Sequence, residues 1–155
     1  MKITNNEIFV ANNYISELKL TKFDKDIRIA LFKNSGELSQ AVKSMQEKLE
    51  ASRKEVFKGL EEQAQKVQAL RMEYNKEETT QERKDEILIE LQDFKEYFKA
   101  EKEYNEVVNK FGDDYVEVNI VKFDFDKFVE FLIDADIDFT TRSLRSVWFM
   151  FNDLK

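Results

Sequence analysis

The apolar residues near the start of the chain recur at spacings of three and four, which places them on one face of a helix. They are Ile8, Ala11, Ile15 and Leu18. Thr4, with Glu7 three residues later, has the pattern of a capping box at a helix start. The sequence therefore predicts an amphipathic helix over about residues 5–20.

The next apolar segment fits two kinds of structure. Alternation of Ile27, Ile29 and Leu31 would suit a strand, whereas Ile27, Ala30 and Leu31 would suit a helix equally well. We favour a helix because no hairpin turn follows the segment. Asn34-Ser35-Gly36 is then expected to kink or end it.

From residue 37 onward, the apolar positions follow a coiled-coil seam that is interrupted once by a stutter. They are Leu38, Val42, Met45 and Leu49, and then Val56, Leu60 and Ala64. The polar stretch 75–80 ends this predicted helix. Thr79 with Glu82 then repeats the capping-box pattern and starts the next one.

The second long helix is expected to end near Phe111, where Gly112 provides a C-terminal cap. Two amphipathic helices of similar length, joined by a short polar turn, should fold back on each other. The sequence therefore predicts an antiparallel helical hairpin over residues 37–111.

The C-terminal part of the chain has a different pattern. Residues 115–123 alternate and are rich in β-branched side chains, which predicts a strand. Asp124 is placed as the N-cap of a helix over residues 125–133, and Thr140 as the cap of a last helix that ends near Asn152.

A single predicted strand requires a partner, because one strand cannot satisfy its own backbone donors and acceptors. We expect it to pair with the 26–33 segment, with a symmetry mate or with another protein. This strand is the strongest argument in the sequence for a binding partner.

Together, these elements predict a mainly α fold: a long antiparallel coiled-coil-like helical hairpin with a small aromatic-rich head containing one short strand. Residues 1–36 would form N-terminal helices that pack on the head. Residues 37–111 would form the hairpin, and residues 112–155 the acidic, aromatic strand-helix-helix head. We expect all three to belong to one folding unit.

Composition removes most catalytic chemistry from consideration. The 155 residues include no proline, cysteine or histidine, and only three glycines. There is therefore no imidazole base, no thiolate, and no ligand set for the usual zinc, haem or iron–sulfur centres. We expect a protein without catalytic residues, bound cofactor or metal. The absence of proline also permits long, unbroken helices.

The charge pattern argues against nucleic acid as a direct partner. The net charge is -7, and residues 112–155 hold ten acidic and five basic side chains. No segment carries the basic stripe that phosphate contacts require. No apolar run is long enough to span a bilayer, so we expect no membrane association. The acidic head could instead imitate DNA, although acids are more often a solvated face.

One acidic motif resembles part of a calcium loop. Asp134, Asp136 and Asp138 match its first three ligand positions, but Phe139 and Arg145 replace the required Gly and Glu. We therefore interpret the motif as a solvated connection. A second group of carboxylates could act in general acid–base catalysis. It consists of the pair Asp124 and Asp126, with Glu117 upstream. An N-cap role explains Asp124 more simply.

The most apolar cluster of the chain, Trp148-Phe149-Met150-Phe151, fits either core packing or an interface hot spot. Arg142 and Arg145 lie one helical turn apart and could pair with the carboxylates of residues 134–138. Nine residues of the head are the predicted partner-binding set: Tyr115, Glu117, Asp124, Asp126, Asp134, Asp136, Asp138, Trp148 and Phe151.

Several segments, taken in order, resemble a family of small tailed-phage proteins that has no assigned activity. They are Ile3-Thr4-Asn5-Asn6-Glu7-Ile8, Ile29-Ala30-Leu31-Phe32-Lys33-Asn34, Glu103-Tyr104-Asn105-Glu106, Val116-Glu117-Val118-Asn119-Ile120, and the closing helix from Leu144 to Asp153 with Phe149-Met150. The resemblance implies a phage origin and a location in the infected bacterial cytoplasm or the virion. It offers no catalytic residues.

The sequence therefore predicts a non-enzymatic phage protein that acts by protein–protein contact, in virion structure or assembly. The partner would be a viral or host protein, and a homo-oligomer would also fit. The alternative is an inhibitor of a host defence or nucleic-acid-processing protein that binds through the acidic head.

Overall fold

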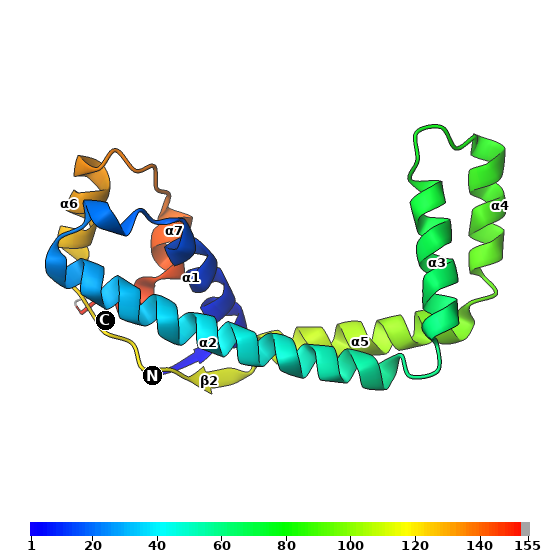
Figure 1. Ribbon diagram of the computed structural model, residues 1–155, viewed down its shortest axis with the longest axis horizontal. Coiled ribbons are helices and arrows are strands. Elements are labelled where there is room, and N and C mark those ends of the chain that lie inside the picture. The colour runs from blue at the N-terminus through cyan, green and yellow to red at the C-terminus, as the bar shows by residue number, and fades with distance from the viewer. Residues whose placement is uncertain (153–155) are drawn as a thin grey trace. The chain divides into compact units, whose positions relative to one another are not determined.

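The computed structural model of the protein describes residues 1–152. This part of the chain is mainly α-helical, as the sequence predicts, with seven α-helices and one small antiparallel sheet. It divides into two compact units (Figure 1). Unit 1 is Met1–Glu47 with Phe111–Lys155, and unit 2 is Lys48–Lys110. Each unit is described by itself.

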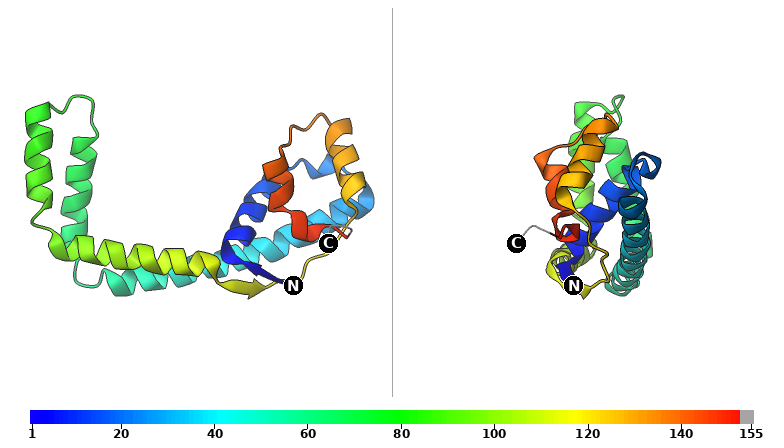
Figure 2. Two further views of the ribbon diagram at one scale, coloured as in Figure 1. Left: turned by 180° about the vertical axis from the view of Figure 1, so that it is seen from behind. Right: turned by 90° about the vertical axis from the view of Figure 1, so that its left-hand side faces the viewer.

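Unit 1 is built from short elements around the first part of one long helix (Figure 2). Its elements are β1 (Lys2–Thr4), α1 (Asn5–Glu17), the 3-10 helix η1 (Leu20–Lys22), α2 (Lys25–Val56) up to residue 47, β2 (Tyr115–Glu117), α6 (Phe125–Asp134), α7 (Thr141–Ser146) and the 3-10 helix η2 (Trp148–Met150). Helices α1 and α7 pack against each other.

The start of α1 confirms the predicted capping box. The Thr4 hydroxyl accepts a hydrogen bond from the Glu7 amide at 3.2 Å, and the Glu7 carboxylate accepts one from the Thr4 amide at 2.9 Å. These bonds satisfy backbone donors that the first helical turn would leave unpaired. The predicted apolar face is buried at Ile8, Ala11 and Ile15. The helix ends at Glu17, three residues earlier than expected.

Helix α2 confirms the helical interpretation of residues 26–33 but contradicts the predicted break after them. The helix continues for 32 residues through Asn34-Ser35-Gly36. Leu31 and Leu38 keep the buried face in register on both sides of this segment, while Gly36 faces open space. Burial on both sides therefore outweighs the local cost of glycine within a helix.

The predicted strand pairs within the chain, with a segment that was not among the expected partners. Strand β2 lies antiparallel to β1, with Ile3 opposite Val116 and Thr4 opposite Tyr115. The pairing was missed because three residues before a helix carry too short a pattern to indicate a strand. None of the three expected pairings, with the 26–33 segment, a symmetry mate or another protein, is the one observed, so the strand no longer argues for a binding partner.

Beyond β2, backbone groups of residues 119–123 form hydrogen bonds with side chains of α2 and with the C-terminal turn. The Asn34 amide group, which is fully buried, donates to the Val121 carbonyl at 2.9 Å and accepts from the Val121 amide at 2.8 Å. Glu37 accepts from the Asn119 amide at 2.9 Å. Further along, the Phe123 amide donates to the Met150 carbonyl at 2.9 Å.

An aromatic cluster fills the centre of unit 1. Phe23 stacks on Phe128 with ring centroids 5.5 Å apart. Phe151 packs against Phe123, Phe125 and Phe128 at centroid distances of 5.3, 4.9 and 5.6 Å. Such contacts add specific geometry to the burial of large apolar surfaces. Four of these rings, Phe23, Phe123, Phe128 and Phe151, belong to the same buried core as the apolar face of α2.

Unit 2 contains the end of α2 together with α3 (Glu61–Tyr74), α4 (Gln81–Leu91) and α5 (Lys95–Asp113) up to residue 110. Helices α3 and α4 form a short antiparallel hairpin (Figure 1). Both of the predicted long helices are therefore interrupted, the first at residues 57–60 and the second at 92–94.

Glycine explains one of these interruptions. Gly59 has a φ of 80°, a left-handed conformation that favours glycine and ends α2. Helix α2 thus ends at Val56, shortly before Gly59, whereas α5 continues through Gly112, which was the expected cap. No glycine or proline marks the break at 92–94, so composition gave no signal for it. The start of α4 also differs by one residue, because Thr80 rather than Thr79 is its N-cap.

The predicted N-caps of the last two α-helices are confirmed, whereas the predicted end of the last helix is not. Asp124 caps α6 by accepting from the Lys127 amide at 2.8 Å, and Thr140 caps α7 by accepting from the Ser143 amide at 3.1 Å. The last α-helix, however, ends at Ser146 rather than near Asn152, and a 3-10 turn follows. That turn directs Phe149 and Met150 into the core.

Candidate partner-binding surfaces

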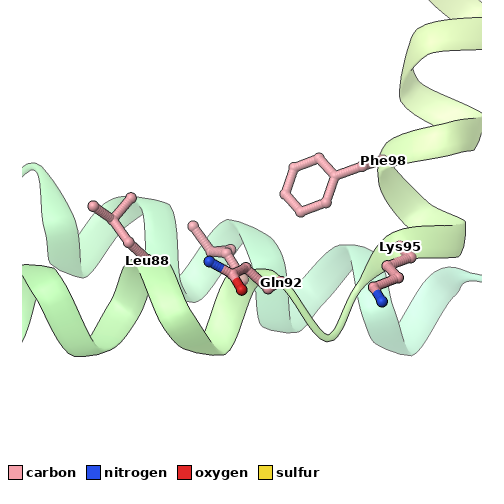
Figure 3. Close-up of a pocket in the computed structure, with 5 residues that line it drawn as sticks. Leu88, Gln92, Lys95 and Phe98 are labelled. Carbon is pink, nitrogen blue, oxygen red and sulfur yellow. The ribbon is translucent and has the colours of Figure 1, made fainter.

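Unit 2 has an open, apolar groove where α4 meets α5 (Figure 3). Its volume is about 490 Å³, and it is lined by Leu88, Leu91, Gln92, Lys95 and Phe98. Phe98 projects from α5 toward the side of α4 that carries Leu88 and Gln92 (Figure 3). We call this hollow the α4–α5 groove.

The orientation of Phe98 is fixed by neighbouring charged residues. The Arg71 guanidinium lies 5.4 Å from the centre of the Phe98 ring, which is a cation–π distance. Arg71 is itself held by two hydrogen bonds of 2.7 and 2.8 Å to the Glu101 carboxylate. These hydrogen bonds from Arg71 hold the pKa of Glu101 below its ordinary value. The groove wall is therefore pre-positioned by a charged pair.

Helix α4 is apolar on more than one side. Ile87 is fully buried and faces the interior of unit 2, whereas Leu88 is 48% exposed and Ile89 is 66% exposed. A helix that is apolar around much of its circumference is usually covered on those sides. The sequence analysis missed this surface, although three consecutive apolar residues in an otherwise charged helix were a visible signal.

Ion pairs join α3 to α4, the helix that carries one wall of the groove. Arg83 of α4 contacts Glu73 of α3 at 2.8 Å, and on its own helix it contacts Glu86 at 3.1 Å and Glu90 at 2.6 Å. Hydrogen bonding from Arg83 lowers the pKa of Glu73 and raises the pKa of Arg83. The α3–α4 hairpin therefore depends on ion pairs as well as on its few buried side chains.

A second hollow lies in unit 1 between α1 and α7. Its volume is about 280 Å³, and it is lined by Asn6, Glu7, Val10, Arg142, Arg145, Ser146 and Trp148. Trp148 is 45% exposed, and Val10 is also exposed. We call this hollow the α1–α7 groove.

The predicted partner-binding residues do not form one surface. Tyr115 and Glu117 are exposed on β2, whereas Phe151 is 1% exposed and belongs to the aromatic cluster. The cluster Trp148–Phe151 is thus divided: three residues pack in the core, and Trp148 alone reaches the surface. The carboxylate of Asp124 is engaged in its cap, and Asp126 is exposed on α6.

The acidic motif 134–138 ends a helix. Asp136 has a φ of 54°, and its amide donates to the Ile133 carbonyl at 3.0 Å, while the Ile137 amide donates to the Leu132 carbonyl at 2.9 Å. These two bonds define a Schellman motif at the end of α6. Asp134 and Asp138 are exposed beside it. Within residues 1–152, no three acidic side chains converge as metal ligands do.

The predicted pairing of Arg142 and Arg145 with residues 134–138 is wrong. Neither guanidinium forms an ion pair with any carboxylate in the described part of the chain. The Schellman turn fixes how the chain leaves α6, and both arginines line the α1–α7 groove instead. The described residues also include no helix long and apolar enough to cross a membrane.

Comparison with models of protein families found no matching family, and comparisons with curated proteins and with solved structures found no match. The resemblance to tailed-phage proteins stays a prediction from the sequence.

Proposed function

We propose that this chain is a non-enzymatic protein that works by protein–protein contact, and that the α4–α5 groove is its main partner site. The observation that carries the proposal is the second apolar side of α4. Leu88 and Leu91 face a 490 Å³ groove, while Ile87 already fills the interior of the unit. Apolar and aromatic side chains in a concave site are the usual anchors of an interface.

The proposed setting is virion structure or assembly. It rests on the sequence resemblance to tailed-phage proteins, and the groove supplies the contact that such a role requires. A partner would place an aliphatic or aromatic side chain between Leu88 and Phe98. Gln92 and Lys95 would then contribute the polar rim that surrounds the apolar centre of most interfaces.

The test uses L88E, which places a charge in the groove, and M72E as a matched control. Met72 is an exposed apolar residue of the same unit that does not line the groove. Tagged wild type, L88E and M72E would be recovered from phage-infected cells, and co-purifying proteins quantified by mass spectrometry. We expect one viral protein to be retained by wild type and M72E and lost with L88E.

Other outcomes would separate the alternatives. If purified wild type self-associates and L88E abolishes this, the partner is a second copy of the chain. If L88E retains the same protein at wild-type level, the groove is not the site. A role in virion structure additionally requires several copies of the chain in purified particles, and their absence would contradict that role.

A second candidate function is inhibition of a host defence or nucleic-acid-processing protein. One observation favours it: Asp126, Glu130 and Asp134 recur every four residues and are all exposed, which places an acidic stripe on one face of α6. Such a stripe could occupy a basic groove of a host protein. D126N/E130Q/D134N would then weaken capture of that protein, and the capture would fall as salt is raised.

A further inference from the structure

We infer that the α1–α7 groove binds a short acidic segment of a partner protein, with carboxylates against Arg142 and Arg145 and an aliphatic side chain against Trp148 and Val10. This inference concerns a different unit from the proposed partner site, and it does not depend on the α4–α5 groove. It rests on the composition, charge and exposure of the groove's lining.

The arginines give the groove its charge. Arg142 and Arg145 lie three residues apart on α7 and line the same hollow, and neither forms an ion pair within residues 1–152. They stand in a segment where acidic residues outnumber basic ones by ten to five. Guanidinium groups match the planar geometry of carboxylates and can bind them through two parallel hydrogen bonds.

Glu7 does not remove this positive charge. Its carboxylate also lines the groove, but the Oε2 atom already accepts hydrogen bonds of 2.9 Å from the Thr4 amide and of 2.9 Å from the Thr4 hydroxyl. Two guanidinium groups against one carboxylate leave the lining with a surplus of positive charge. An acidic ligand is therefore the one whose charge complements the groove.

The apolar part of the lining indicates that the ligand carries more than charge. Trp148 is 45% exposed and Val10 is 50% exposed, so a bound side chain would remove apolar surface of both from water. Tryptophan and arginine are both enriched in interface hot spots. A protein segment combines carboxylates with aliphatic side chains, whereas a nucleic acid offers phosphates but no aliphatic side chain to cover Trp148 and Val10.

The tryptophan makes the groove directly measurable, because Trp148 is the only tryptophan of the chain. The probe is a blocked peptide, Asp-Asp-Leu-Leu-Glu-Glu, added to the full chain while the intrinsic fluorescence is recorded. We expect a saturable shift of emission that weakens as salt rises. The neutral analogue Asn-Asn-Leu-Leu-Gln-Gln should bind at least roughly tenfold more weakly.

Two double variants with the same change in net charge separate a specific site from general attraction. R142Q/R145Q is expected to weaken binding of the acidic peptide by roughly tenfold or more. K19Q/K22Q removes two exposed cations of the same unit outside the groove and should change binding less than about twofold. Peptide-induced shifts of backbone resonances in α1 and α7 of the wild type provide a second readout should R142Q/R145Q misfold.

Four results would overturn the inference. They are no change in emission up to about 5 mM peptide, equal binding of the neutral analogue, equal loss in K19Q/K22Q, and resonance shifts confined to regions outside α1 and α7. A single-stranded oligonucleotide of equal charge serves as the competing ligand. Tighter binding of the oligonucleotide would assign the groove to nucleic acid instead. None of these results depends on Leu88, so the two surfaces are tested separately.

Discussion

The side chain of Asn34 takes the place that a neighbouring strand would otherwise occupy. Both polar atoms of its amide bond the backbone of Val121, and the residue is fully buried. Loss of a buried side chain that satisfies two backbone groups leaves both groups without partners. One residue thus satisfies backbone groups of the predicted strand that lie beyond the β1–β2 pairing.

This arrangement predicts the effect of N34A. The substitution should lower the free energy of unfolding by about 2–4 kcal/mol, because it empties the fully buried Asn34 position and leaves the Val121 amide and carbonyl without their side-chain partners. Urea denaturation measures the change. N13A, at an exposed position of α1, is the control and should shift stability by less than about 0.5 kcal/mol. A loss below about 1 kcal/mol for N34A would contradict the role assigned to Asn34.

The Arg71–Glu101 pair predicts a pH dependence. Arg71 lowers the pKa of Glu101 below its ordinary value of 4.5, so the folded chain binds a proton at lower pH than the unfolded chain does. The stabilisation is therefore complete above the unfolded pKa and is lost as pH falls through the folded pKa.

Between about pH 5 and pH 3, the free energy of unfolding of E101Q should therefore fall less than that of the wild type. E103Q, an exposed carboxylate on the same helix, is the matched control and should leave the profile unchanged. Urea midpoints measured across this range provide the test. Parallel profiles for E101Q and wild type would show that the pair does not contribute.

At the scale of elements, two glycines of one chain have opposite roles. Gly36 lies in the middle of α2, where an added Cβ would meet no atom within 4 Å. Gly59 follows the end of the same helix with a φ of 80°. Only the second position needs glycine for its backbone conformation.

The two substitutions should therefore change stability in opposite directions. G36A should stabilise the chain by about 0.5–1 kcal/mol, because alanine favours a helix more than glycine does. G59A should destabilise it by about 1 kcal/mol, because a left-handed conformation strains alanine. Thermal unfolding followed by circular dichroism distinguishes them. The same sign for both would contradict the helix boundaries described above.

Patterns that the sequence carries locally were predictable. The Thr4 capping box, the Asp124 and Thr140 caps and the buried face of α1 depend on residues within one or two turns. Features that depend on contacts between residues far apart in the chain could not be predicted from the sequence. The β1–β2 pairing, the Asn34 bonds to Val121 and the position of Arg142 beside α1 each join segments whose proximity no local period reveals. The groove at Leu88 needed a helix break that no glycine or proline marks.

At the scale of the whole molecule, buried apolar side chains are unevenly distributed. Of those in residues 1–152, all but Val67, Ile87 and Ala100 belong to the core of unit 1. Few buried apolar contacts mean a low free energy of local opening. Unit 2 therefore depends more on its ion pairs, and its helices should open without unfolding of unit 1.

Hydrogen exchange measured by mass spectrometry tests this difference. When all are measured at the same pH, amides of α3 and α4 should exchange faster than those of α1 and of α2 before residue 47. Raised salt should increase this difference in exchange rate, because the ion pairs of Arg83 are exposed to solvent and are therefore screened. Equal protection in both units would show that they open together.

The sheet pairing also has a consequence for synthesis of the chain. Thr4 pairs with Tyr115, so β1 leaves the ribosome long before its partner exists. At translation rates of about 5–20 residues per second, the delay is on the order of ten seconds. During this interval α1 and α2 can form, but the carbonyl and amide groups of β1 have no strand to bond. The sheet therefore closes only after residue 115 has been synthesised, so α1 has to be held in place by its own packing until then.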